Sequence, residues 1–192
     1  MTITIGKRVR HTALSKWTRV ACLIGASLYL PAMSAYATVT CGVDRGYSPE
    51  GSAEQLLLTA IGRARQSIRV AAYTFTAPTV ARALIDARRR RVDVAVVADA
   101  KESAKRSQQA TLDLLVSADI PVRTVSAYQI HHDKYMVFDG AALETGSLNY
   151  STAALRRNSE NALLLQCPEL ARDLLTHWQS RWDQGVAYEL SY

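Results

Sequence analysis

The chain has 192 residues, of which 48% are hydrophobic and 21% are charged, and this length and composition suggest one globular domain. It contains 23 Lys and Arg against 17 Asp and Glu, but residues 1–37 hold five of the basic residues and no acidic one. Residues 38–192 therefore carry 18 basic and 17 acidic residues. Because these numbers nearly balance, the overall charge gives no reason to expect that this part of the chain binds nucleic acid.

The N-terminal segment has the three-part pattern of a secretory signal peptide. Five basic residues lie before residue 20, an apolar run covers residues 20–33, and Ala35-Tyr36-Ala37 forms a small-x-small cleavage pattern. The apolar run is shorter than the roughly 20 residues that a membrane-spanning helix needs, which disfavours the alternative of an uncleaved anchor. We predict a signal peptide over residues 1–37, a single domain over residues 38–192, a periplasmic or secreted location, and no stable membrane insertion after cleavage.

Two of the three cysteines, Cys41 and Cys167, lie after the predicted cleavage site. Export places them in an oxidising compartment, and each lies at the edge of a strand-like segment, so the sequence favours a disulfide between them. Two free, buried thiols are the alternative. Two cysteines are too few for a cysteine-based metal site, and we predict no metal site.

Strand-like and helix-like segments alternate after the leader. Ser48-Pro49 is typical of a helix start, and helical periodicity follows through Ile61. Further helices are expected from Pro78 and over residues 111–116 and 169–182. Strands are expected over residues 67–75, 92–98, 120–125, 134–138, 141–144 and 160–166. Asp139-Gly140 predicts a hairpin, and the Val-rich segment 92–98 predicts a strand buried on both faces. The alternation predicts an α/β fold with a mixed β-sheet sandwiched by helices.

One short window, residues 131–151, gathers the residues best suited to chemistry. His132 and Lys134 are separated by one residue, and Gly146, Ser147 and Asn149 follow. A neutral imidazole is a nucleophile toward phosphorus, a lysine supplies positive charge for phosphate oxygens, and Ser and Asn supply neutral donors. Strand alternation puts His132 and Lys134 on the same face, and Gly146 would let the backbone approach a ligand closely. The window predicts a phosphate site with a nucleophile inside it, for which the protein supplies the positive charge without a metal ion.

The complete pattern in this window, HxK(x)4D(x)6GSxN, resembles the signature of the phospholipase D superfamily. Similarity to the small periplasmic endonucleases of that superfamily extends to GYSPEGSA, AAYTFTAP, RNSENALLL and HWQSRWDQG, and covers essentially the whole chain after the leader. The resemblance implies a phospholipase D/nuclease-like fold, no cofactor, and hydrolysis of phosphodiester bonds.

The resemblance also implies a role for each motif residue. His132 would form a phosphohistidine, and Glu160 would hydrogen-bond His132 and orient it. Asp139 would be a structural, ion-pairing residue. The residues implied to bind phosphate are Lys134, Ser147 and Asn149.

The superfamily uses two such motifs per active site, but this chain contains one, because none of His11, His131 and His177 precedes a lysine at the motif spacing. The resemblance therefore implies a homodimer in which two copies of His132 face each other across the interface. One copy would attack phosphorus, and the other would protonate the leaving oxygen and then activate water. The expected products carry 5′-phosphate and 3′-hydroxyl ends.

Three functions compete on this basis. The first is a metal-independent, sequence-nonspecific endonuclease that acts on DNA or RNA. The second is a phosphodiesterase acting on lipid head groups, which the length disfavours because lipid enzymes of the superfamily usually carry both motifs in one longer chain. The third is a catalytically silent binding protein, which the intact motif disfavours.

The other histidines and the clustered arginines are weaker candidates for a functional site. We expect His131 to point away from the site and His177 to pack among apolar neighbours, and strand alternation disfavours a His131/His132 metal pair. The four arginines at residues 88–91 are expected to form a solvated helix end, although the superfamily tends to have Gly where Arg91 stands. The residues better placed to contact a nucleic-acid backbone are Arg156 and Arg157.

Overall fold

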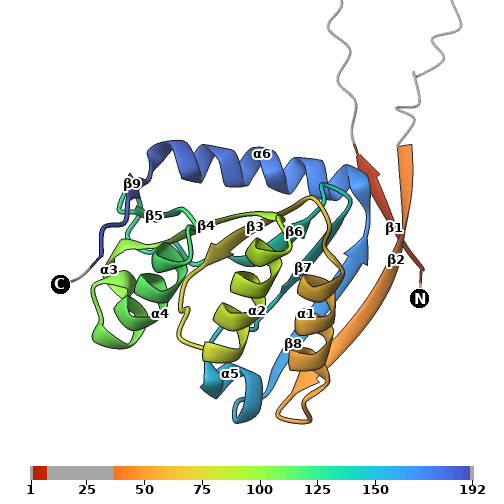
Figure 1. Cartoon of the computed structure of the whole chain (residues 1–192). Coiled ribbons are helices and arrows are strands. Elements are labelled where there is room, and N and C mark those ends of the chain that lie inside the picture. Colours follow the sequence, from red (N-terminus) through yellow and green to blue (C-terminus); the bar gives the residue numbers. More distant parts are fainter. Residues whose placement is uncertain (1, 8–36, 191–192) are drawn as a thin grey trace, which may run out of the picture.

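The computed structural model describes residues 2–7 and 37–190, in which nine strands form one sheet (Figure 1). The strands lie in the order β1-β2-β8-β7-β6-β3-β4-β5-β9. Pairs β3·β4 and β4·β5 are parallel, and the other neighbours are antiparallel. The strands are β1 (Thr2–Lys7), β2 (Ala37–Ser48), β3 (Ser67–Ala72), β4 (Asp93–Asp99), β5 (Val122–Val125), β6 (Lys134–Phe138), β7 (Ala142–Gly146), β8 (Glu160–Gln166) and β9 (Val186–Ala187).

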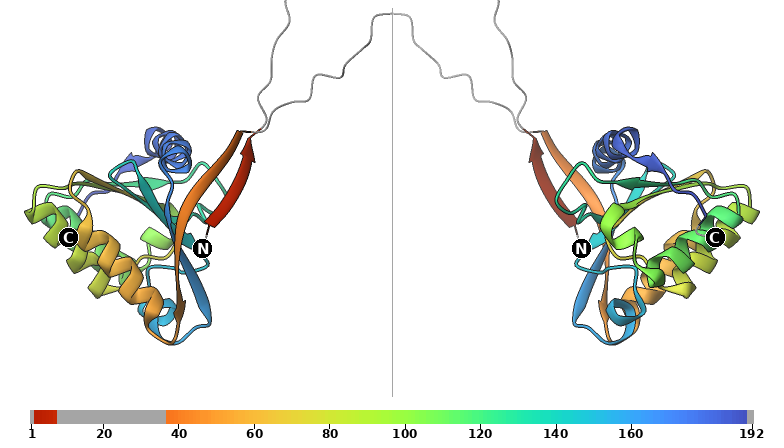
Figure 2. Two further views of the ribbon diagram at one scale, coloured as in Figure 1. Left: turned by 90° about the vertical axis from the view of Figure 1, so that its right-hand side faces the viewer. Right: turned by 90° about the vertical axis from the view of Figure 1, so that its left-hand side faces the viewer.

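Helices cover both faces of this sheet, so the predicted α/β fold with a mixed sheet is confirmed (Figures 1 and 2). The helices are α1 (Ser52–Arg63), α2 (Pro78–Arg89), α3 (Ala100–Ser103), α4 (Arg106–Ser117), α5 (Thr152–Arg156) and α6 (Pro168–Gln184). Residues from α1, α2 and α4 form one apolar core with one face of the sheet, and α6 covers the other face. Val96 faces the first core and Val97 the second, as expected for a strand buried on both faces.

The first helix begins later than predicted. Ser48 ends β2, and its buried hydroxyl donates to the backbone oxygens of Ala154 (2.6 Å) and Asn158 (2.8 Å) instead of capping α1. Helix α1 starts at Ser52, after Gly51 with φ 84°. The local cap signal was outweighed by contacts with a segment about a hundred residues away in the sequence.

Cys41 and Cys167 form a disulfide whose Cα atoms are 5.0 Å apart. The bond joins β2 to the residue before α6, and both cysteines are buried in the core beneath α6. The structure therefore contains the predicted disulfide and not the alternative, two free thiols.

Most of the predicted signal peptide lies outside the described residues. Its first residues, Thr2–Lys7, form β1 and pair antiparallel with β2 in a register that runs from Thr2↔Gly42 to Lys7↔Ala37. The signal peptide and its cleavage stay predictions. Within residues 2–7 and 37–190, no helix has the length and apolar character needed to cross a bilayer.

Candidate functional site

The motif residues meet at one edge of the sheet because of the strand register. The start of β6 pairs with the end of β3 (Lys134↔Ala72), and the end of β7 pairs with the start of β8 (Gly146↔Ala162). Since β6 and β7 are antiparallel neighbours, these four strand ends lie together. The sheet therefore brings His132, Lys134, Ser147 and Glu160 into one region.

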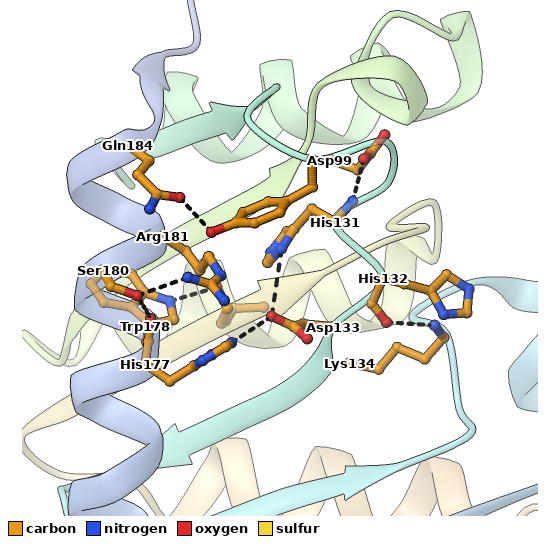
Figure 3. Close-up of polar contacts among 12 residues, drawn as sticks. Asp99, His131, His132, Asp133, Lys134, His177, Trp178, Ser180, Arg181 and Gln184 are labelled. Atoms are coloured by element: carbon orange, nitrogen blue, oxygen red, sulfur yellow. Dashed lines mark hydrogen bonds and ion pairs between the residues drawn. The ribbon is translucent and has the colours of Figure 1, made fainter.

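Lys134 and His132 contact each other and share an aromatic neighbour. The Lys134 ammonium donates to the backbone oxygen of His132 at 3.0 Å and lies 5.3 Å from the centroid of the Tyr73 ring. The His132 ring is 4.6 Å from the same ring, centroid to centroid, and the His132 residue is exposed. His132 and Lys134 extend from the same segment in Figure 3. The predicted nucleophile, His132, is thus open to solvent, and a cation lies beside it.

Burial lowers the pKa of Lys134 from its usual value, while the nearby carboxylates of Asp133 and Glu160 act in the opposite direction. A partly desolvated ammonium has lost some contact with water, so an incoming phosphate oxygen has less solvent to displace. The position suits binding of an anion.

Ser147 and Glu160 form a second group of polar contacts. The Ser147 hydroxyl donates to the Glu160 carboxylate, which also accepts from the Asn158 amide at 3.0 Å. The backbone amide of Asn161 donates to Ser147 Oγ at 3.1 Å. These bonds fix the serine hydroxyl on the β8 side of the site.

The implied hydrogen bond between Glu160 and His132 is absent among the described residues. Glu160 starts β8 and His132 precedes β6, and β7 lies between these two strands. The carboxylate therefore reaches Ser147, at the end of the adjacent strand, and orients that residue instead.

Asn149 lies on the loop after β7. Its side-chain oxygen is buried and has no hydrogen-bond partner in the described part of the chain. Its backbone oxygen accepts from the amide of Ser151 at 2.8 Å. Phosphate binding by Asn149 stays a prediction.

A buried acid supports the loop that carries Ser147 and Asn149. Tyr150 is fully buried and donates its phenolic hydrogen to Glu144, on β7, at 2.9 Å. Burial raises the pKa of Glu144 to about 8, and the Tyr150 hydrogen bond lowers it in part. The backbone oxygen of Tyr150 accepts from the amides of Thr76 and Ala77, both at 2.9 Å. The loop is thus fastened to the segment that follows β3.

Asp139 lies at the β6–β7 turn, at the far end of β6 from His132. Burial opposes ionisation of Asp139, but the backbone amides of Ser67 (2.9 Å), Gln66 (2.7 Å) and Arg65 (3.0 Å) hydrogen-bond its carboxylate and hold its pKa below the usual value. The structural role implied by the resemblance fits this position. Its hydrogen-bond partners are backbone amides, so the expected ion-pairing role is replaced by amide capping.

Gly146 is required by the packing of two neighbouring strands. A Cβ atom at this position would lie 2.2 Å from the backbone oxygen of Asn161. Glycine therefore allows β7 to pack tightly against β8, and close approach of a ligand to Gly146 stays a prediction.

The two arginines singled out for nucleic-acid contact differ in structure. Arg156 donates twice to the Glu54 carboxylate, with both distances 3.1 Å, and so joins α5 to α1. Arg157 is exposed and has no side-chain partner among the described residues. Arg157 can therefore meet an incoming backbone phosphate directly, whereas Arg156 would first have to give up its bonds to Glu54.

The arginines at residues 88–91 end helix α2, as expected. Arg89 pairs with Asp86 at 3.0 Å, and Arg90 donates to the backbone oxygen of Ile61 at 3.0 Å. Arg91 has φ 67°, a left-handed conformation that glycine adopts without strain, and this explains why Gly would suit the position.

His177 was expected to pack among apolar side chains, and this prediction is wrong. Its Nε2 lies 2.9 Å from the carboxylate of Asp133, which lies 3.5 Å from Nδ1 of His131 (Figure 3). His131 is buried, in agreement with a side chain that points away from the substrate.

An open pocket of about 710 Å³ connects the motif with helix α6. His132, Lys134 and Ser147 line one part of it, and Leu174 and His177 of α6 line another. The pocket therefore brings together an imidazole, a cation and a hydroxyl, an arrangement suited to binding a phosphodiester.

Comparison with known proteins identifies the family. The sequence profile of the family described as cardiolipin synthase, PLD-like domain, matches residues 57–182. The chain belongs to the phospholipase D superfamily.

Its relatives in the superfamily include proteins with different names. The chain is 33% identical over 135 residues to phospholipase D of Rickettsia bellii, and the aligned region covers 70% of this chain and 66% of the relative. It is 34% identical over 144 residues to mitochondrial cardiolipin hydrolase of Homo sapiens, and the aligned region covers 75% of this chain and 55% of the relative. The chain thus spans between about half and two thirds of the length of these two relatives.

Two solved structures share the fold of this chain. Nuc from Salmonella typhimurium, a phospholipase D family member, superposes with a TM-score of 0.76 and 45% identity, over 78% of this chain and 99% of Nuc. NucT from Helicobacter pylori superposes with a TM-score of 0.67 at 22% identity and shows the shared fold alone. The predicted enzyme class, phosphodiester hydrolase, is confirmed at the level of the superfamily.

Two residues of this phospholipase D-like site were missed in the sequence. Tyr73 directly follows β3 but lies inside the strand expected over residues 67–75, and no pattern in the sequence set it apart from its neighbours. Asp133 lies inside the HxK motif, but its contacts with His131 and His177 depend on the packing of α6 and have no local signature.

Proposed function

We propose that this protein is a metal-independent, sequence-nonspecific endonuclease that cleaves DNA or RNA through a phosphohistidine on His132. The observation that carries this proposal is the convergence of exposed His132, half-buried Lys134 and exposed Ser147 on one open pocket. The 45% identity to Nuc over 99% of that protein supports a nucleic-acid substrate.

In the proposed reaction, the His132 imidazole attacks phosphorus, a nitrogen–phosphorus bond forms, and the bond from phosphorus to the 3′ oxygen breaks. Lys134 and Ser147 stabilise the charge on the phosphate oxygens. Water then breaks the nitrogen–phosphorus bond and frees His132. The products carry 5′-phosphate and 3′-hydroxyl ends.

We propose that the functional form is a homodimer. Each chain supplies one motif, and the reaction needs a second group to protonate the leaving oxygen and to activate water. The His132 of a second copy supplies that group if the exposed His132 residues face each other across a two-fold axis.

We also propose that the mature protein acts in the periplasm or outside the cell. The signal-peptide pattern over residues 1–37 supports this location, and so does the disulfide between Cys41 and Cys167.

The deciding experiment is nicking of supercoiled plasmid DNA by the purified protein in excess EDTA, beside His132→Asn. The proposal requires nicking by the wild type and none by the variant. An inert wild type that is folded and dimeric would rule out the nuclease function.

The relatives named phospholipase D and cardiolipin hydrolase favour a second candidate, a phosphodiesterase acting on lipid head groups. The Leu170 and Leu174 side chains in the pocket wall would suit an apolar part of such a substrate. Release of phosphatidic acid from cardiolipin vesicles, without nicking of plasmid DNA, would select this candidate.

A further inference from the structure

The segment that carries His132 and Lys134 is fastened to helix α6 by groups that the proposed reaction does not use. Asp133 lies between these two residues, and its Oδ2 atom is 2.9 Å from Nε2 of His177 and 3.5 Å from Nδ1 of His131. Figure 3 shows His132 and Lys134 on the other side of the segment from His177. Alternation along an extended chain explains this arrangement, because consecutive side chains point in opposite directions.

His177 is itself held in a fixed place. The next residue, Trp178, is buried, and its indole nitrogen donates to the backbone oxygen of Val70 at 2.8 Å. Val70 lies on β3, which pairs directly with β6. The bond from Trp178 fixes the rotation of α6 relative to β3, the neighbour of β6. The side chain of His177 is therefore held in a fixed position next to Asp133.

The same segment is anchored from the opposite direction by Asp99, which ends β4. Its buried carboxylate accepts from the backbone amide of His131 at 2.7 Å and from that of Glu102 at 2.8 Å. The His131 ring is also buried, and its Nε2 has no partner in the described part of the chain. Burial lowers the pKa of His131, which favours the neutral form of the ring beside Asp133. The backbone just before His132 is therefore fixed on both sides.

By contrast, His132 has few contacts of its own. It is exposed, and its contacts in the described part of the chain are with the Tyr73 ring and with the Lys134 ammonium, which donates to its backbone oxygen. An exposed nucleophile of this kind takes its position from its backbone. The bonds that Asp133 makes decide that position, because Asp133 is the next residue.

We propose that Asp133 and His177 form a positioning pair that sets the place of His132 and Lys134 relative to the scissile phosphate. The proposal rests on the phosphodiesterase function of His132 and assigns neither residue a contact with the substrate. Helix α6 becomes part of the active-site framework. Loss of the pair would lower kcat more than it raises KM, since Lys134 and Ser147 would still be present to bind phosphate while the reacting atoms would be misplaced.

The test compares four single variants and one double variant with the wild type on plasmid DNA and on bis(4-nitrophenyl) phosphate, with EDTA present. Asp133→Asn removes the charge of the carboxylate, and it is measured alone and together with His177→Phe. His177→Phe removes the bond to Asp133. His177→Gln keeps an amide nitrogen near the position of Nε2 and can still donate. Gln179→Ala is the matched control, because Gln179 is exposed on the same helix and bonds only within it, to Asp183.

We expect His177→Phe to lose about tenfold to a hundredfold in kcat with KM changed by less than about twofold, as misplacement of reacting groups predicts. His177→Gln should recover most of that loss, and Gln179→Ala should match the wild type. Asp133→Asn combined with His177→Phe should be no slower than the slower single variant, because both act through one bond. The imidazole NMR signals of His132 should shift in His177→Phe and not in Gln179→Ala.

Wild-type kcat in a folded His177→Phe protein, with unshifted His132 signals, would overturn the positioning pair and leave the proposed function intact. Equal losses of kcat in His177→Gln and His177→Phe would also overturn it, since the hydrogen bond to Asp133 would then have no effect on the rate. A folded wild type that cleaves neither substrate would instead refute the function on which the pair depends.

Discussion

Tyr150 donates a hydrogen bond to the carboxyl group of Glu144 at 2.9 Å, and both side chains are buried directly beneath the loop that carries Ser147 and Asn149. Burial raises the pKa of Glu144 from 4.5 to about 8. The neutral acid therefore belongs to the folded state, and the active-site loop is supported by a group that titrates near physiological pH.

The stability of the protein should consequently fall as Glu144 ionises. A folded-state pKa above the unfolded one gives a contribution that is complete below about pH 4.5 and is lost as the pH rises to about 8. The loss over that interval should be on the order of several kcal/mol. Urea unfolding of the wild type and of Glu144→Gln, which stays neutral, at pH 5 and pH 9 measures it. Equal pH dependence in the two proteins would contradict a buried neutral Glu144.

Gly146→Ala should destabilise the protein and impair the site. The added Cβ would lie 2.2 Å from the backbone oxygen of Asn161, so β7 and β8 must separate. Overpacking of this kind costs about 1–3 kcal/mol or more. Thermal unfolding measures the loss, and Gly62→Ala is the control, because a Cβ at Gly62 meets nothing within 4 Å. Similar melting temperatures for both variants would refute the packing role.

Glu160→Gln should lower activity through Ser147. The serine hydroxyl now donates to the carboxylate of Glu160, and a neutral amide would hold it less strongly. We expect kcat to fall by about tenfold. This loss is smaller than that for complete removal of a hydrogen-bond donor, because the Ser147 hydroxyl would be held less firmly but would still be present. If Glu160 acts only through Ser147, Glu160→Gln in a Ser147→Ala background should cause little further loss of kcat. A full additional tenfold loss in that background would show a separate role for Glu160.

Arg156→Ala and Arg157→Ala should have different effects on nucleic-acid binding. Arg157 is exposed and free of side-chain partners among the described residues, so its loss should weaken DNA binding and lower the slope of log K against log salt by about one. Arg156 is engaged by Glu54, and its loss should leave that slope unchanged while lowering the melting temperature. Equal slopes for the two variants, measured by fluorescence anisotropy with inactive His132→Asn protein, would contradict this assignment.

Removal of the disulfide should destabilise the chain strongly. The bond closes a loop across a sequence separation of 126 residues, and the chain-entropy relation gives a contribution of about 5 kcal/mol for a loop of this size. Cys41→Ala/Cys167→Ala should unfold at a lower urea concentration than the wild type. A reducing agent should shift the wild type toward the variant and leave the variant itself unchanged.

The sequence alone was enough for the parts of the protein that depend on short-range pattern. Periodicity placed strands close to β4, β6 and β8, and Asp139-Gly140 marked the hairpin between β6 and β7. The motif spacing selected His132, Lys134 and Ser147, because the chemistry of phosphate transfer limits which side chains can serve. These features are encoded by residues near one another in the chain.

The tertiary structure decided which partner each polar group takes. The strand order β8-β7-β6-β3 puts Glu160 next to Ser147 and a strand away from His132, and the packing of α6 brings His177 to Asp133. It likewise turns Arg156 toward Glu54. A hydrogen bond acts over about 3 Å, so its partner depends on how distant segments are packed, and local sequence patterns carry no information about that packing.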